Sequence, residues 1–186
     1  LAARARADFY AAELGGEKII VHSYGKLSGD ASEMNERAIY AGRGKQHLDF
    51  FYHIDHVGKK TKAEIDLKGA LADESKKIFR GTLDFKRGCA GSVGDEGDFA
   101  IQLDPKTKNI SLPLLLCTED DVQGNHASSA GQLDQNTIYF LMSRGFTLEE
   151  ARRIVVEALI RPIIDGMDEA LREEVLNAVR MKLDRE

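Results

Sequence analysis

Alternation of apolar and polar residues with a period of two dominates the first 118 residues of the chain. In the segment 64–71, Ile65 and Leu67 alternate with charged neighbours, and the pattern recurs at 79–85, 99–104 and 110–116, with further candidates at 19–24, 37–41 and 47–57. Such alternation predicts strands with one buried face. The connections are short and rich in turn residues, and none is long enough for a crossover helix, which argues against a doubly wound α/β sheet.

The arrangement of these strands stays open at this level. In the alternating segments we expect Phe79, Leu83 and Phe85, then Phe99, Ile101 and Leu103, then Ile110, Leu112, Leu114 and Leu116 to share one face each. A sandwich, a barrel and a β-solenoid all fit such strands. The sequence has no strict repeat that would choose among them.

Helical periodicity replaces the alternation after residue 134. Asp134 is expected to cap a short helix that ends at Gly145, and Thr147 with Glu150 predicts the capping box of a second helix, which Pro162 should stop. A last helix follows. The predicted apolar stripes are Ile138, Leu141 and Met142, then Ala151, Ile154, Val155, Ala158 and Leu159, then Leu171, Val175, Ala178, Val179 and Leu183. We therefore expect a β body at residues 1–133 and a helical domain at residues 134–186.

Composition narrows the functional classes. The formal net charge of -5 argues against a broad nucleic-acid-binding face, and no apolar run approaches the roughly 20 residues that span a bilayer. The first residues lack the apolar core of a signal peptide, and the missing initiator Met suggests a portion of a longer chain. Cys89 and Cys117 alone suggest a reducing, cytoplasmic location, and two thiols cannot supply the four thiolates of an ordinary iron–sulfur site.

Two segments carry metal-ligating residue types, whereas phosphate-loop, serine-elbow and zinc-helix motifs are absent from the sequence. On a strand, His47, Asp49, His53 and Asp55 would share one face, with His56 on the opposite face. Imidazole and carboxylate groups together bind zinc or iron, although a solvated strand face gives the same pattern. One candidate function is therefore a stand-alone metal- or ligand-binding β-solenoid, or a metalloenzyme, that uses this face.

The second segment runs from Cys117 to His126 and holds a thiol, three carboxylates and an imidazole within ten residues. These groups could supply soft and hard metal ligands together. An acidic turn with a hydrogen-bonded His126 explains the same residues equally well.

This second segment and its continuation resemble a known family. The order and spacing of Glu119-Asp120-Asp121-Val122, His126, Gly131-Gln132-Leu133-Asp134, Tyr139-Phe140-Leu141 and Ser143-Arg144-Gly145 resemble the junction between body and tail in SufB/SufD proteins of iron–sulfur cluster assembly. Upstream, the segments 44–49 and 80–83 and His56 are similar to the SufD-type body.

The resemblance implies a right-handed parallel β-helix followed by a C-terminal helical domain, and a scaffold rather than an enzyme. It implies pairing with a SufB-like partner or a second copy, without nucleic acid or membrane. It also implies docking of a SufC-like ABC ATPase on the helical tail. The candidate partner-binding residues there are Tyr139, Phe140, Arg144, Gly145, Phe146 and Thr147.

The resemblance also bears on metal chemistry. We expect no cofactor bound tightly by this chain alone, and a transient iron–sulfur cluster at a subunit interface, where His126 would be a metal ligand. The chain has Gln123-Gly124-Asn125-His126-Ala127 where SufD-type proteins often carry Lys-Cys-Ser-His-Gly, so the His is kept and the Cys is lost. SufB-type proteins tend to carry a Glu at the position of Ala127. The chain is thus more SufD-like than SufB-like, and its own capacity to hold a cluster is weakened.

Overall fold

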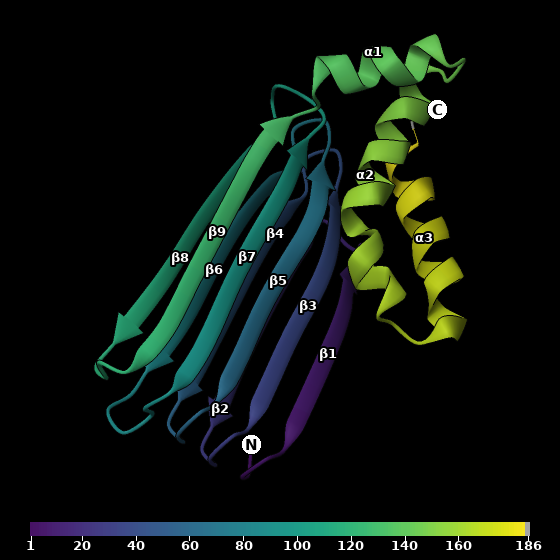
Figure 1. The fold of residues 1–186 in the computed structure, drawn as a ribbon. Coiled ribbons are helices and arrows are strands. Elements are labelled where there is room, and N and C mark those ends of the chain that lie inside the picture. Colours follow the sequence, from purple (N-terminus) through teal and green to yellow (C-terminus); the bar gives the residue numbers. More distant parts are fainter. Residues whose placement is uncertain (185–186) are drawn as a thin grey trace.

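Nine strands followed by three helices make up residues 1–184, the part of the chain that the computed structural model describes (Figure 1). The strands are β1 (Arg6–Glu13), β2 (Lys18–Leu27), β3 (Glu33–Gly42), β4 (His47–His56), β5 (Lys62–Leu71), β6 (Lys76–Phe85), β7 (Ser92–Gln102), β8 (Lys108–Cys117) and β9 (Val122–Gln132). The helices are α1 (Gln135–Ser143), α2 (Leu148–Asp165) and α3 (Glu169–Leu183).

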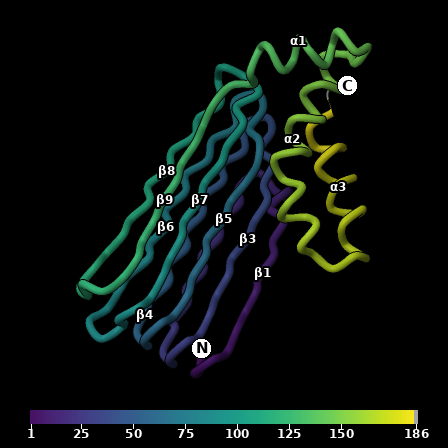
Figure 2. Tube along the Cα trace, viewed as in Figure 1, coloured from purple at the N-terminus to yellow at the C-terminus, as the bar shows by residue number. Residues whose placement is uncertain are grey.

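Successive strands alternate between two parallel sheets. One sheet has the order β1-β3-β5-β7-β9 and the other the order β2-β4-β6-β8, so each strand pairs with the strand one full coil later. Lys18, His47, Lys76 and Lys108 stand in one register column as a result, and the winding can be followed in the backbone trace (Figure 2). The predicted parallel β-helix is confirmed, and it replaces the sandwich and the barrel as alternatives.

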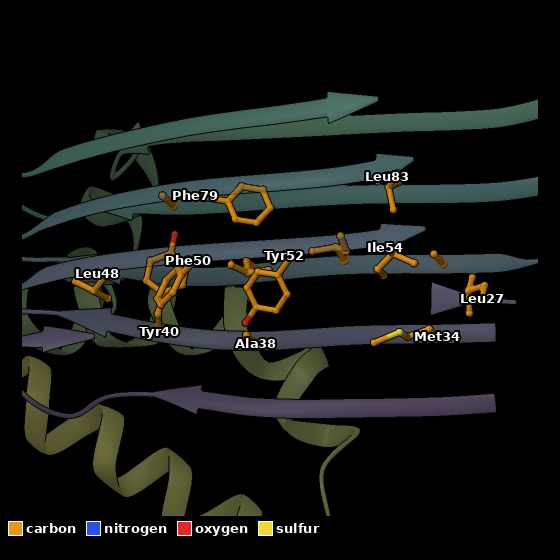
Figure 3. Close-up of a cluster of buried hydrophobic side chains, with 14 of the residues drawn as sticks. Leu27, Met34, Ala38, Tyr40, Leu48, Phe50, Tyr52, Ile54, Phe79 and Leu83 are labelled. Atoms are coloured by element: carbon orange, nitrogen blue, oxygen red, sulfur yellow. The ribbon is translucent and has the colours of Figure 1, made fainter. Parts of the chain in front are cut away.

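The space between the two sheets, here called the lumen, is filled by inward-facing side chains (Figure 3). Leu48, Phe50 and Ile54 of β4 stack on Phe79 and Leu83 of β6, and all five are buried. Burial of one such side chain stabilises the fold by about 1.5–3 kcal/mol. The prediction that the apolar residues of 64–71 and 79–85 face the core is therefore confirmed.

Hydroxyl side chains recur at the ends of the turns. Ser32, Ser75 and Thr107 each donate a hydrogen bond of 2.8 Å to the backbone carbonyl three residues earlier. Ser32, Thr61 and Ser92 directly precede the register partners Glu33, Lys62 and Val93, and Thr61 shares a hydrogen bond of 2.8 Å with Ser92. These buried hydroxyls satisfy turn backbone groups that would otherwise be costly to bury.

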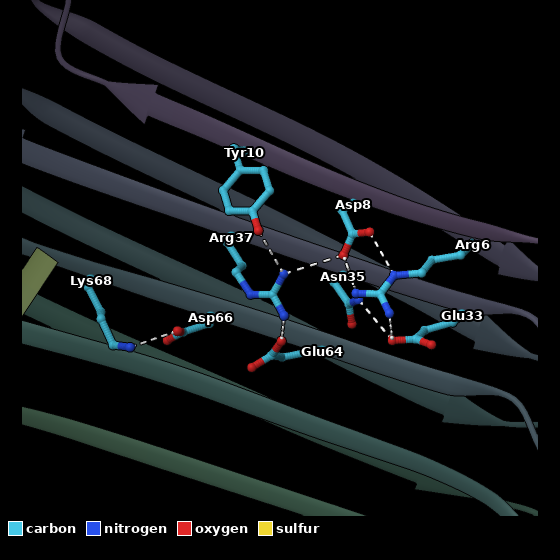
Figure 4. A network of polar contacts seen from close by, with 9 residues as sticks. All are labelled: Arg6, Asp8, Tyr10, Glu33, Asn35, Arg37, Glu64, Asp66 and Lys68. Carbon is cyan, nitrogen blue, oxygen red and sulfur yellow. Dashed lines mark hydrogen bonds and ion pairs between the residues drawn. The ribbon is translucent and has the colours of Figure 1, made fainter. Parts of the chain in front are cut away.

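The outer face of the five-stranded sheet carries paired charges on β1, β3 and β5 (Figure 4). Arg6 and Asn35 donate hydrogen bonds to Asp8, at 2.7 Å and 2.8 Å, and these bonds hold the pKa of the Asp8 carboxyl well below its ordinary value. Arg37 lies between Asp8 and Glu64 and pairs with both. Arg37 and its two partners keep between 21% and 38% of their side-chain area exposed, and surface pairs of this kind are worth little individually.

The helical tail folds back over the early coils. A second buried cluster joins Ile39 on the outer face of β3 to Ile160, Ile163 and Ile164 of α2 and to Leu176 of α3. Figure 1 shows α2 and α3 side by side next to β1 and β3, while α1 lies across the end of the strands. The predicted boundary between residues 133 and 134 falls between β9 and α1. That it separates two domains stays a prediction.

Three details of the predicted tail are wrong. Pro162 lies inside α2 rather than at its end, because burial of Ile163 and Ile164 on its C-terminal side outweighs the backbone hydrogen bond that proline cannot donate. The apolar stripe of α2 is also shifted: Ile154 is exposed, whereas the residues that face the core are Val156, Ile160, Ile163 and Ile164. The buried residues of α3 are Leu176 and Val179, while Leu171 is exposed.

The predicted helix starts are confirmed. The carboxylate of Asp134 accepts hydrogen bonds from the backbone N–H groups of Asn136 and Thr137. Thr147 and Glu150 form a reciprocal capping box at the start of α2. None of the helices within residues 1–184 is both long and apolar enough to cross a bilayer.

Candidate functional site

The last coil of the β-helix, formed by β8 and β9, is the most distinctive surface of the molecule. Each of these strands is the final member of its sheet, and within residues 1–184 no further strand pairs with their outer edges. Unpaired N–H and C=O groups along such edges are a template for pairing with another chain.

An apolar row covers the outer face of β8. Ile110, Leu112, Leu114 and Leu116, here called the β8 outer row, are between 39% and 53% exposed. In register they continue the outer positions of β6, whereas Leu115 faces the lumen beside Leu83. The expectation of one apolar face in this segment is confirmed, but that face is turned to solvent rather than to the core.

His126 lies on β9 in register with Glu96 of β7. Residues that pair in register point to the same face of a parallel sheet, and Glu96 is an inward residue that is only 3% exposed. His126 is therefore directed to the inner side of the last coil, and it is itself exposed because no coil covers it within the described residues.

Glu96 is buried beneath this coil without a partner. Neither of its carboxylate oxygens has a hydrogen-bond partner within residues 1–184. Burial, together with the nearby charge of Asp98, raises the pKa of Glu96 to about 8. A Cβ at Gly81 would overlap the carboxylate of Glu96, so the glycine provides the space that this side chain occupies.

A buried ion pair lies next to Glu96 in the lumen. Lys77 is fully buried, and its ammonium group donates hydrogen bonds to Asp98 and, at 3.1 Å, to the hydroxyl of Tyr40. Burial lowers the pKa of Lys77 despite the opposing charge of Asp98, and burial with the Asp98 charge raises the pKa of Tyr40 well above its usual range. The lumen below the last coil is thus polar, in contrast to the apolar layers around β4.

The alternation of apolar and polar residues in β7 predicts the wrong inward face, so this polar layer is not expected from the sequence. Phe99 and Ile101 were expected to face the core, but the inward positions are Glu96, Asp98 and Ala100. The alternation shows that the two faces differ without showing which one faces the lumen. Register with Ile65 and Leu67 of β5, which are fully buried, is what identifies the inner face.

One of the three acidic residues in the segment from Cys117 to His126 has a structural role. Glu119 accepts a hydrogen bond of 2.8 Å from the backbone N–H of Gly88, which lowers the pKa of its carboxyl. Glu119 therefore links the connection between β8 and β9 to the turn between β6 and β7. Cys117 is exposed at the end of β8, while Cys89 is buried in an earlier turn.

The candidate partner-binding residues of the tail form one exposed group. Tyr139 is 76% exposed, Phe140 and Phe146 are also exposed, and the guanidinium of Arg144 stacks 5.0 Å above the ring of Phe140. Gly145 has a φ of 97°, a left-handed conformation that favours glycine. This turn ends α1 and leads directly to the capping box that begins with Thr147.

The four residues predicted to share one face of β4 do so, but they do not form a single cluster. His47, Asp49, His53 and Asp55 occupy alternate outward positions, and His56 faces inward as expected. Only His53 and Asp55 approach each other, at 3.0 Å between Nε2 and Oδ1. Asp49 pairs with Arg80 instead.

His56 itself is a buried structural residue. Its Nδ1 lies 2.7 Å from the hydroxyl of Thr61, and its ring stacks on Phe85 at 4.4 Å between centroids. Burial lowers the pKa of His56 to about 4, so it is neutral at physiological pH.

The fold and the open last coil define a class of protein, namely a parallel β-helix with a C-terminal helical tail. The chain belongs to the SufBD family, since the family description "SUF system FeS cluster assembly, SufBD core domain" matches residues 1–159. The predicted SufB/SufD resemblance is thereby confirmed.

Curated relatives agree. The chain is 30% identical over 158 residues to the iron–sulfur cluster assembly protein SufD of Bacillus subtilis, covering 84% of this chain and 36% of that protein. It is 23% identical over 144 residues to SufB of the same organism, covering 77% and 31%. A SufBD family protein of Mycobacterium leprae is 26% identical over 179 residues, covering 91% and 46%. The chain thus spans less than half the length of each of these relatives.

Proposed function

We propose that this chain is a non-catalytic scaffold subunit of a cytoplasmic SUF-type iron–sulfur cluster assembly complex. It would pair through its last coil with a SufB-like subunit or a second copy of itself, and its helical tail would dock a SufC-like ABC ATPase. The observation that carries the proposal is the last coil, where two unpaired strand edges meet an exposed apolar row in a member of the SufBD family.

The β8 outer row supports the pairing of two β-helical bodies. Exposed apolar rows are unfavourable in water unless a partner covers them, and an open strand edge offers backbone hydrogen bonds to the same partner. A second β-helix with a similar last coil satisfies both requirements at once, because its own terminal strands carry the same unpaired groups.

The turn between α1 and α2 supports ATPase docking. Tyr139, Phe140 and Phe146 are large exposed aromatic residues next to Arg144, and aromatic residues with arginine dominate the binding energy of protein interfaces. Gly145 and the capping box at Thr147 fix the direction in which the chain leaves the turn, so these side chains are presented by a well-defined backbone.

His126 would contact iron at the interface of the two bodies. Its imidazole lies on the inner side of the last coil, above the unpartnered carboxylate of Glu96. Imidazole and carboxylate groups both ligate iron. The partner would have to supply thiolates, so the cluster is transient cargo of the complex and not a cofactor of this chain.

Co-purification of the full-length protein with its ATPase and a SufB-like subunit tests the proposal. Leu112→Asp should abolish pairing of the β-helical bodies, since it places a charge in the β8 outer row, whereas Ile20→Asp on the far strand β2 should leave pairing intact. Phe140→Ala should weaken ATPase binding without affecting the pairing. Pairing that is unaffected by Leu112→Asp would contradict the role given to the last coil.

Iron loading provides a separate measurement. His126→Ala should lower the amount of iron and sulfide that the reconstituted complex retains, while complex formation stays normal. Unchanged loading would make His126 a structural residue of the junction.

A further inference from the structure

A second cluster of metal-ligating side chains lies on the opposite sheet from His126. It consists of His53 and Asp55 at the end of β4 and Asp84 at the end of β6, on the outer face of the four-stranded sheet. One ligand atom from each residue lies within 4.8 Å of the others. We propose that these three residues form a binding site for a divalent transition-metal ion such as Zn²⁺, independent of the cluster-assembly function.

The two carboxylates are held close together where they should repel each other. Asp55 and Asp84 are direct register partners on neighbouring strands, and like charges in that position are destabilising. Their side chains are only 9% and 8% exposed, so water screens the repulsion poorly. A cation beside these oxygens would therefore relieve the repulsion.

Lys86 places a positive charge next to both carboxylates. Its ammonium group pairs with Asp84 and lies 3.6 Å from Asp55. The Lys86 side chain is 45% exposed and begins just beyond the end of β6. A flexible, half-exposed lysine can leave for solvent without moving a strand, so a metal ion can take its place between the carboxylates.

Two further neighbours orient the carboxylate of Asp55. Tyr24 donates a hydrogen bond to one oxygen of Asp55, and the other oxygen lies 3.0 Å from Nε2 of His53. Both oxygens of Asp55 are therefore held in position by neighbouring side chains.

The donor set indicates the class of ion. One imidazole and two carboxylates, with open positions for water, suit Zn²⁺ and related transition ions, whereas Ca²⁺ and Mg²⁺ prefer oxygen ligands alone. The three ligands come from two adjacent strands of a rigid sheet, so little order has to be gained when the ion binds.

Calorimetric titration of Zn²⁺ into the chelator-treated chain tests the site. We expect one saturable equivalent whose affinity falls at least 10-fold in His53→Ala and in Asp84→Asn, in line with the effect of losing support for a metal. His47→Ala is the matched control, because His47 lies on the same strand and the same face but outside the cluster. Circular dichroism confirms that each variant is folded.

Lys86→Met provides the decisive comparison. Removal of the competing ammonium group should raise the Zn²⁺ affinity, whereas a surface histidine site elsewhere would not respond to this change. Absence of saturable binding to the parent chain, equal affinity in folded Asp84→Asn, or a greater loss in His47→Ala than in His53→Ala would each overturn the proposal.

Discussion

The buried carboxyl of Glu96 should make the stability of this protein depend on pH in an unusual direction. In the unfolded chain a glutamate titrates near 4.5, while burial next to Asp98 raises the pKa of Glu96 to about 8 in the folded protein. Below pH 4.5 the group is protonated in both states and has no effect. As the pH rises from 4.5 to 8, the unfolded chain releases the proton while the folded protein keeps it, so the free energy of unfolding falls.

The magnitude follows from the two pKa values. One pH unit corresponds to about 1.4 kcal/mol, so the full interval costs the folded state about 5 kcal/mol. Between pH 5 and pH 7 the loss attributable to Glu96 is about 2.5 kcal/mol. This is a large share of the 5–15 kcal/mol by which proteins of this kind are typically stable.

Urea unfolding at pH 5 and pH 7, followed by circular dichroism, measures this effect. Glu96→Gln carries no titrating proton, so its stability relative to the parent chain should improve by about 2.5 kcal/mol between the two pH values. Glu174→Gln replaces an exposed carboxylate of α3 and serves as the control, with no comparable change. A Glu96→Gln chain whose stability fell with pH as steeply as that of the parent would refute the reasoning.

Three further sets of variants test the buried ion pair, a helix cap and the apolar packing. Lys77→Met leaves the buried carboxylate of Asp98 unpaired and should cost about 3–5 kcal/mol, most of which the added change Asp98→Leu should restore; urea midpoints of the two variants decide this. Thr147→Ala removes the N-cap of α2 and should cost about 1 kcal/mol, seen as a lower melting temperature. Leu48→Ala opens a cavity in the lumen and should cost about 2–5 kcal/mol, whereas the exposed Ile20→Ala should stay within about 0.5 kcal/mol in the same unfolding experiment.

The sequence was sufficient for the strands of the middle coils and for the helix starts. Ile65 and Leu67 face the core as their alternation predicts, and Asp134 and Thr147 cap the helices that follow them. In β7 the alternation predicts the wrong inward face, and in β8 the apolar face is turned to solvent instead of the core. The inner face of β7 carries Glu96 and Asp98, and the outer face of β8 carries leucines. Hydrophobicity alone therefore indicates the wrong inward face in both strands.

The coil repeat of the β-helix is not recognisable in the amino-acid sequence for a related reason. Its coils share a register and a hydroxyl residue at the turns, as Ser32, Thr61 and Ser92 illustrate, but not the identity of their neighbours. The cluster of His53 and Asp55 with Asp84 depends on the same register, because Asp84 comes from the next coil. Long-range pairing of this kind cannot be inferred from local spacing.

Because the helical tail packs against the early coils, it connects the last coil of the β-helix mechanically to the first. In a solenoid each coil contacts only its neighbours, so a local disturbance normally spreads one coil at a time. Here the guanidinium of Arg43 donates a hydrogen bond of 2.6 Å to the carbonyl of Asp184, and Lys182 bonds to the carbonyl of Leu14. A load applied to the helices therefore reaches the beginning of the β-helix directly, bypassing β7 and β9, and the two ends of the solenoid are coupled through the tail.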